Sequence, residues 1–109
     1  PEVLDYFSDP FFAIGLARLE CHYFSNHCFL EQGQILRDLA KIHHLPAIIV
    51  HGRYDMICTC DNAWVLHQSW PGSELNIVRD AGHSASEPAT TSALIEATQN
   101  MAARFLHLK

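Results

Sequence analysis

The chain has 109 residues, of which 49% are apolar and 17% charged, and its formal net charge is −5. This balance is typical of a folded domain and excludes a disordered tail, and the length allows at most one domain. No apolar run approaches the roughly 20 residues that span a bilayer, and the dispersed Lys and Arg residues lack the basic patch that nucleic acid requires. We therefore expect a cytoplasmic protein that binds neither membrane nor nucleic acid.

The chain contains eight histidines and four cysteines, so a metal site has to be considered. Cys58 and Cys60 are separated by one residue rather than by the two of common zinc knuckles, and no His-x(3)-His pair follows them. The adjacent His43 and His44 cannot both face one site from a regular element. We predict no metal site, and we expect free thiols because nothing in the sequence indicates secretion.

Two helices are predicted in the N-terminal part of the chain. Asp9 and Pro10 form the pattern of an N-cap and a first helical turn, and apolar residues at helical spacing follow, which predicts a helix over residues 10–24. A second helix is predicted over residues 31–42. The residues expected to be buried are Phe12, Leu16, Leu19 and Tyr23 in the first helix and Ile35, Leu39 and Ile42 in the second.

Glu20 has an unusual position in the first of these helices. Helical spacing places it on a face with Ala13, Ala17 and Phe24, whereas a carboxylate more often lies on a charged face. Composition alone favours the simpler interpretation, a glutamate at the edge of the buried stripe.

Strands and helices alternate in the remainder of the chain, which indicates the α/β class. We predict a strand over residues 45–52, a helix capped by Asp61 and stopped by Pro71-Gly72, a strand over 74–78, a loop over 80–87 and a helix from Pro88. The expected buried residues are Ala63, Leu66 and Trp70 in the first of these helices and Leu94, Ala97, Met101, Phe105 and Leu108 in the second. This order predicts two parallel strands joined by a right-handed βαβ connection.

Two strands do not form a sheet that is stable alone. The first strand is continuously apolar and rich in β-branched residues, which is typical of a strand buried on both faces and paired on both sides. We therefore expect either self-association through an exposed sheet edge or a fragment of a larger sheet whose other strands precede it.

Asp55 and His83 are the candidate catalytic residues. Asp55 follows the first strand in the turn His51-Gly52-Arg53-Tyr54-Asp55, and His83 follows the second strand in Ala81-Gly82-His83-Ser84. Open α/β sheets place their active sites at the carboxyl ends of adjacent strands. An aspartate there can orient a histidine that acts as general base, as in a Ser-His-Asp triad. The alternative is a turn aspartate and a loop histidine without a shared role.

No serine of the chain fits the nucleophile position of such a triad. The strained nucleophile turn requires Gly-x-Ser-x-Gly, and this motif is absent from the 109 residues. Ser84 and Ser86 lie near His83, but neither is followed two residues later by glycine. We expect the chain to be the C-terminal piece of an enzyme whose serine lies in an earlier segment.

Three sequence blocks resemble the C-terminal third of the proline iminopeptidases. These blocks are residues 17–24 (Ala-Arg-Leu-Glu-Cys-His-Tyr-Phe), residues 48–55 (Ile-Ile-Val-His-Gly-Arg-Tyr-Asp) and residues 81–84 (Ala-Gly-His-Ser). The Gly-His pair alone is common, but three blocks in order over residues 12–106 are more specific. The resemblance implies an α/β-hydrolase fold, with residues 1–30 as the end of a helical cap and residues 31–109 as the C-terminal part of the catalytic domain.

By this resemblance Asp55 is the triad acid, His83 is the general base, and Glu20 binds the free α-amino group of the substrate. The implied enzyme is a serine aminopeptidase that releases N-terminal proline from peptides and needs no metal or organic cofactor. The chain departs from the usual family pattern at Cys21, where the family has Asn, and at Cys58-Thr59, where Cys-Pro is common. These departures leave the substrate preference open.

Two other interpretations compete with this one. The chain could be part of an α/β-hydrolase of another specificity, such as an esterase, which has no ammonium for Glu20 to bind. It could also be a non-catalytic module that persists by oligomerising or by binding a partner.

Overall fold

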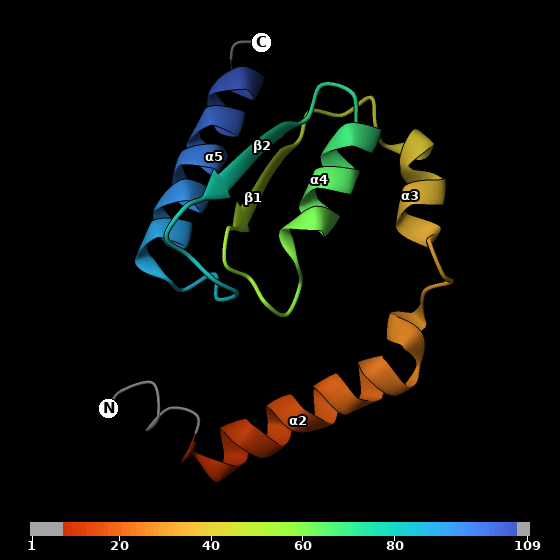
Figure 1. The fold of residues 1–109 in the computed structure, drawn as a ribbon, viewed down its shortest axis with the longest axis vertical. Coiled ribbons are helices and arrows are strands. Elements are labelled where there is room, and N and C mark those ends of the chain that lie inside the picture. Colours follow the sequence, from red (N-terminus) through yellow and green to blue (C-terminus); the bar gives the residue numbers. More distant parts are fainter. Residues whose placement is uncertain (1–7, 107–109) are drawn as a thin grey trace. The chain divides into compact units, whose positions relative to one another are not determined.

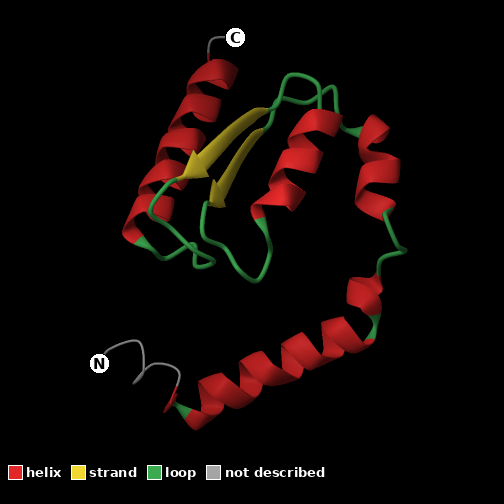
Figure 2. Cartoon of the chain, viewed as in Figure 1, coloured by secondary structure: helices red, strands yellow, loops and turns green. Residues whose placement is uncertain are grey.

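The computed structural model describes residues 8–106, and the chain divides into two compact units, the first ending at Gln34 and the second beginning at Ile35. The elements are α2 (Pro10–Ser25), η1 (His27–Phe29), α3 (Gln34–Asp38), η2 (Leu39–Lys41), β1 (Ile48–Gly52), α4 (Cys60–Ser69), β2 (Glu74–Val78) and α5 (Pro88–Leu106), as Figures 1 and 2 show. Within residues 8–106, no helix has the length and apolar character needed to cross a membrane.

The first unit is built around α2, whose predicted start is confirmed. One carboxylate oxygen of Asp9 accepts hydrogen bonds from the backbone N–H groups of Phe11 at 2.8 Å and Phe12 at 3.3 Å, which caps the helix. The predicted burial of its apolar stripe is wrong, because α2 contains no buried residue and Leu19 is 61% exposed. The only other regular element that the structure describes within this unit is the short η1, which is too small to cover a helix face.

A left-handed turn follows α2. His27, Cys28 and Phe29 have φ angles of 50°, 54° and 58°, a region that disfavours residues with a side chain. The ring of Phe29 makes an edge contact with the ring of Tyr23, with centroids 5.5 Å apart, and a tilted contact with His22 at 5.3 Å. The favourable free energy of these ring contacts offsets part of the cost of the left-handed backbone.

The second predicted helix is shorter than expected. Residues 31–42 form α3 and then the 3₁₀ turn η2 rather than one continuous helix. Gly33 has a φ of +69°, which is outside the helical region, so α3 begins only at Gln34. Of the three residues predicted to be buried, only Leu39 is buried, at 3% exposure.

The second unit contains a parallel sheet of two strands, and the predicted α/β class is confirmed. β1 and β2 pair in register, from Ile48 opposite Glu74 to Gly52 opposite Val78. α5 covers one face of the sheet and α4 the other (Figure 1). The predicted full burial of β1 is wrong for the described residues, since all of its residues except Gly52 are only partly buried.

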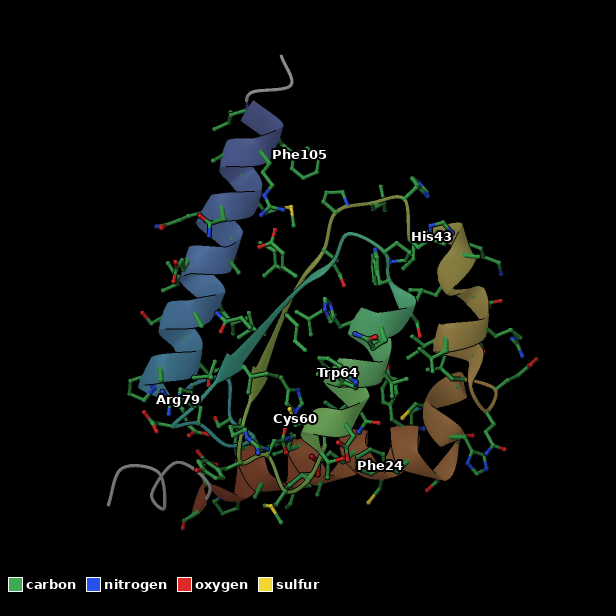
Figure 3. All side chains as sticks on the ribbon, turned by 45° about the horizontal axis from the view of Figure 1, so that its top comes forward. Phe24, His43, Cys60, Trp64, Arg79 and Phe105 are labelled. Carbon is green, nitrogen blue, oxygen red and sulfur yellow. The ribbon has the colours of Figure 1, made fainter. Side chains whose placement is uncertain are left out.

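The connecting helix α4 begins slightly earlier than predicted. Its N-cap is Thr59, and the predicted cap Asp61 lies instead in the first turn. Ala63 is buried as expected, whereas Trp64 is 54% exposed. Figure 3 shows Cys60 in the first turn of α4 and Trp64 one turn further along.

The terminal helix α5 begins at Pro88 as predicted, and its predicted buried stripe is confirmed in part. Ala97 and Met101 of that stripe are partly buried, and Thr90 and Ala93, which were not predicted, are buried and partly buried. Leu94 and Phe105 of the predicted stripe are 39% and 53% exposed, and Leu108 lies outside the described residues. The helix therefore approaches the sheet through small residues, because alanine and threonine allow close helix–strand packing.

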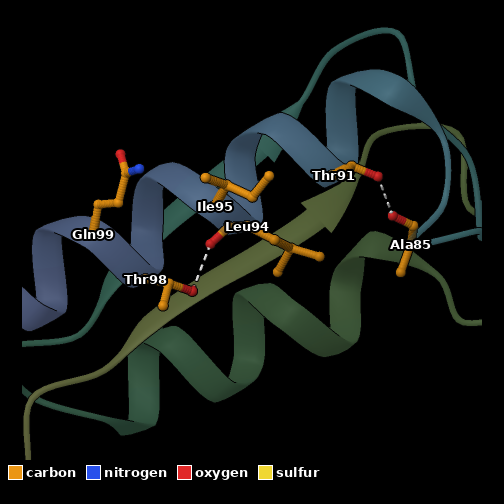
Figure 4. Close-up of a pocket in the computed structure, with 6 residues that line it drawn as sticks. All are labelled: Ala85, Thr91, Leu94, Ile95, Thr98 and Gln99. Atoms are coloured by element: carbon orange, nitrogen blue, oxygen red, sulfur yellow. Dashed lines mark hydrogen bonds between the residues drawn. The ribbon is translucent and has the colours of Figure 1, made fainter.

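Two of the larger apolar residues of α5 border a hollow. Leu94 and Ile95 line it together with Ala85, Thr91, Thr98 and Gln99 (Figure 4). Thr91 Oγ1 donates a hydrogen bond to the carbonyl oxygen of Ala85 at 2.8 Å, which ties the helix to the preceding loop.

The loops that follow β1 and β2 lie in close contact. The backbone N–H of Arg53 donates to the carbonyl oxygen of Val78 at 2.8 Å, and that of Tyr54 donates to Ala81 at 2.9 Å. A Cβ atom added to Gly52 would lie 2.0 Å from the carbonyl oxygen of Gly82. Glycine at position 52 is therefore required for the two loops to meet.

We predict that Gly52→Ala destabilises the chain by about 2–3 kcal/mol, because the new methyl group collides with backbone that cannot rotate away. The matched control is Gly15→Ala. Gly15 lies inside α2, and a Cβ atom added to it would meet nothing within 4 Å. The control is expected to be neutral or to stabilise the helix by about 0.5–1 kcal/mol. Urea unfolding followed by circular dichroism measures both, and an unchanged midpoint for Gly52→Ala would contradict the close approach.

Candidate acid–base site

Asp55 lies at the end of the turn that follows β1. Its side chain is 7% exposed, and its Oδ1 accepts hydrogen bonds from the backbone N–H groups of Ile57 at 2.9 Å and Cys58 at 2.8 Å. These bonds hold the carboxylate in one orientation, because an aspartate that binds the backbone two and three residues ahead fixes its own turn.

His83 lies in the loop after β2 and faces this carboxylate. Its Nδ1 is 3.1 Å from Oδ1 and 3.0 Å from Oδ2 of Asp55, and its side chain is 54% exposed. An ionised carboxylate only accepts hydrogen bonds, so we assign the imidazole proton to Nδ1. In the neutral ring Nε2 then carries a lone pair, and an exposed lone pair of this kind can accept a proton.

Opposing effects set the pKa of the Asp55 carboxyl group. Burial raises the pKa. The hydrogen bond from His83, those from the backbone of Cys58 and Ile57, and the charge of His83 together lower the pKa by more than burial raises it. The result is a pKa of about 2, against an ordinary value of 3.8. The group is therefore a carboxylate at neutral pH and a stable hydrogen-bond acceptor for His83.

His51, on β1, is a second histidine beside Asp55, and no motif in the sequence pointed to it. Its Nε2 lies 2.9 Å from the carbonyl oxygen of Cys58, to which it donates, and 3.7 Å from Oδ2 of Asp55. The ring is largely buried, with 16% of its side chain exposed. It thus braces the turn of residues 55–58 that holds the carboxylate.

Glu87 is another residue that sequence reasoning missed. Both of its carboxylate oxygens lie 3.0 Å from the backbone nitrogen of Gly82, and Oε1 also accepts from that of Ser84 at 3.2 Å. A signal was present, because Ser84-x-x-Glu87 before Pro88 has the form of a capping box.

Glu20 is described only within the first unit. It is exposed on α2, as is Phe24 at 67% exposure. The role of this exposed carboxylate in binding the substrate's amino group stays a prediction.

The cysteines and histidines do not gather into a cluster in the described part of the chain. All four cysteines are free, and Cys21, Cys28 and Cys58 are exposed. Among residues 8–106, no three His, Cys, Asp or Glu side chains lie close enough together to hold a metal ion.

The lowered pKa of Asp55 predicts a specific dependence of stability on pH. Because the folded-state pKa is below the unfolded value, the contribution of the carboxylate is fully present above about pH 4 and is lost as the pH falls toward 2. We expect Asp55→Asn to be less stable than the parent chain at pH 7 and the difference to shrink over this window. Urea midpoints measured from pH 7 to pH 2 test this, with Asp61→Asn as control, and a constant difference at every pH would contradict it.

Several proteins similar to this chain are named proline iminopeptidase. A protein of Xylella fastidiosa (strain Temecula1 / ATCC 700964) named proline iminopeptidase is 50% identical over 93 residues, which are 84% of this chain and 30% of that protein. The proline iminopeptidase of Arabidopsis thaliana is 45% identical over 87% of this chain and 25% of its own length. That of Neisseria gonorrhoeae is 39% identical over 97% of this chain and 34% of its own length. No family model matches the chain.

The chain spans about a third of the length of the curated relatives that it matches, with 30% of the Xylella protein and 34% of the Neisseria protein aligned. The matches cover most of this chain and lie in the C-terminal portion of the relatives, which are α/β-hydrolases. The sequence of this chain therefore corresponds to the C-terminal portion of the proline iminopeptidase family, and its fold to that portion of an α/β-hydrolase.

Proposed function

We propose that this chain is the part of a serine aminopeptidase that carries the triad acid and base, and that the whole enzyme releases N-terminal proline from peptides. The observation that supports this most directly is the pair of 3.0 Å and 3.1 Å contacts between Nδ1 of His83 and the carboxylate of Asp55. Similarity to proteins named proline iminopeptidase supplies the substrate class.

In the proposed reaction His83 acts as general base. Its Nε2 removes the hydroxyl proton of a serine, the serine oxygen attacks the carbonyl carbon of the N-terminal proline, and the proton then passes to the leaving amine. Water, deprotonated by the same Nε2, hydrolyses the acyl-enzyme. Asp55 remains a carboxylate throughout and stabilises the imidazolium that forms.

The nucleophile of this reaction would lie outside the 109 residues, because they contain no Gly-x-Ser-x-Gly motif. We therefore propose that the 109-residue chain alone does not turn over substrate. No metal or organic cofactor takes part in the proposed reaction.

We assign Glu20 to the substrate's α-amino group. Its carboxylate is a suitable partner for an ammonium once the pocket around α2 is complete, because a charge pair strengthens when water is excluded. The same residue separates this proposal from the esterase alternative, since an ester substrate carries no ammonium.

Three variants of the protein encoded by the complete gene test these roles. Asp55→Asn and His83→Gln are expected to lower kcat by about 10⁴-fold for both proline p-nitroanilide and p-nitrophenyl acetate, because both substrates need the acid–base pair. Glu20→Gln is expected to lower kcat/KM for the anilide by about 100-fold through loss of the ammonium contact, and to change acetate hydrolysis by less than about twofold.

Asp61→Asn, an exposed carboxylate in the first turn of α4, is the matched control and should leave both activities unchanged. Equal loss of both activities in Glu20→Gln would remove the assignment of Glu20 and favour an esterase. Full activity in His83→Gln would overturn the acid–base assignment itself.

For the isolated chain we propose a cytoplasmic location and self-association through a sheet edge. In the part of the chain that the structure describes, each strand of the sheet has a single strand neighbour, and an open edge presents unpaired backbone groups. Met56 and Ile57, in the loop after β1, are 85% and 75% exposed and add further apolar surface.

Analytical ultracentrifugation of the 109-residue chain tests the self-association. We expect dimers or larger species whose proportion rises with protein concentration, because edge pairing and apolar contact both remove surface from water. A monomer at all concentrations would contradict the proposal and leave the acid–base assignment untouched.

A further inference from the structure

The carboxylate of Glu87 binds the backbone on both sides of His83. The N–H of Gly82, the residue before the histidine, donates to both Oε1 and Oε2 at 3.0 Å. The N–H of Ser84, the residue after it, donates to Oε1 at 3.2 Å. One side chain therefore fixes the two peptide groups that flank the imidazole.

Glu87 is itself held firmly. It is partly buried, and its backbone N–H donates to the carbonyl oxygen of Ser84 at 3.2 Å. Its own carbonyl oxygen accepts from the N–H of Thr91 at 2.9 Å, in the first turn of α5. The carboxylate is thus anchored to the start of a 19-residue helix that packs on the sheet.

The histidine ring has little packing of its own, because 54% of its side chain is exposed. The hydrogen bonds of its side chain within residues 8–106 are the two from Nδ1 to Asp55. The direction of Nε2 therefore depends on that contact and on the path of the loop backbone. Charge-assisted hydrogen bonds are the strongest that a backbone N–H makes, so Glu87 is well suited to fix this path.

We propose that Glu87 is a positioning residue, which holds the loop of residues 82–84 so that Nδ1 of His83 meets Asp55 and Nε2 points to the substrate. Glu87 touches neither Nδ1 nor Nε2 and acts through the backbone. Its catalytic consequence rests on the function proposed above, whereas its effect on the Asp55–His83 contact does not.

The first experiment measures the His83 tautomer in the 109-residue chain by ¹⁵N NMR at a pH where the ring is neutral. The His83 signals are assigned by their loss in His83→Gln. We expect the Nδ1–H tautomer to dominate in the parent chain, because Asp55 accepts that hydrogen bond. The population of the Nε2–H tautomer should rise in Glu87→Gln and rise further in Glu87→Ala. Gln keeps one acceptor oxygen but presents an amide N–H₂ in place of the other.

Glu96→Gln is the matched control, since Glu96 is an exposed glutamate of α5. It should leave the tautomer of His83 unchanged. Circular dichroism checks that each variant folds; Glu87→Gln, the near-isosteric change, decides the question if Glu87→Ala unfolds. An Nδ1–H population equal to that of the parent in a folded Glu87→Gln variant would overturn the proposal.

The second experiment measures proline p-nitroanilide cleavage by the protein encoded by the complete gene. We expect kcat to fall about 10-fold in Glu87→Gln and about 100-fold in Glu87→Ala, with KM changed by less than about twofold, because misplacing the base affects the transition state more than substrate binding. Unchanged kcat in both Glu87 variants, with His83→Gln inactive, would overturn the positioning role and leave the proposed function intact. An inactive parent enzyme would overturn the proposed function, while the tautomer measurement would still decide the role of Glu87.

Discussion

The site depends on the close approach of the two loops that follow the parallel strands. Gly52 ends β1 so near the backbone of Gly82 that any side chain there would collide with a carbonyl oxygen. Hydrogen bonds from Arg53 to the end of β2 and from Tyr54 to the loop after it hold this contact closed. Because residues 28 apart in sequence then share one corner of the sheet, Asp55 and His83 come within hydrogen-bonding distance.

The Asp55 carboxylate shows how the fold keeps a buried charge ionised. Burial alone would favour the protonated form, but hydrogen bonds from His83 and from two backbone N–H groups favour the charged form more strongly. His51 braces the same turn from β1. Glu87 performs a comparable task for the loop of His83, so each member of the pair is held by backbone contacts of its own turn or loop.

The exposure of apolar side chains on α2 is consistent with the finding that this chain aligns with only about a third of the length of its relatives. Phe11, Leu19 and Phe24 of α2 are more than half exposed, and α2 contains no buried residue. Proteins that are similar over 84–97% of this chain are about three times as long. Sequence periodicity marks a face as apolar, but it cannot say whether the surface that would cover that face lies within the same 109 residues.

The sequence by itself determined the start of α2 at Asp9-Pro10, both strands, the start of α5 at Pro88 and the family. These features depend on local chemistry, namely caps, proline, β-branched runs and short motifs. It also placed Asp55 and His83 at neighbouring strand ends. Only the tertiary structure decided that α5 packs through Thr90 and Ala93 rather than Leu94, and that His51 and Glu87 support the pair. Those choices depend on how closely elements approach one another, which is a property of packed surfaces and not of residue spacing.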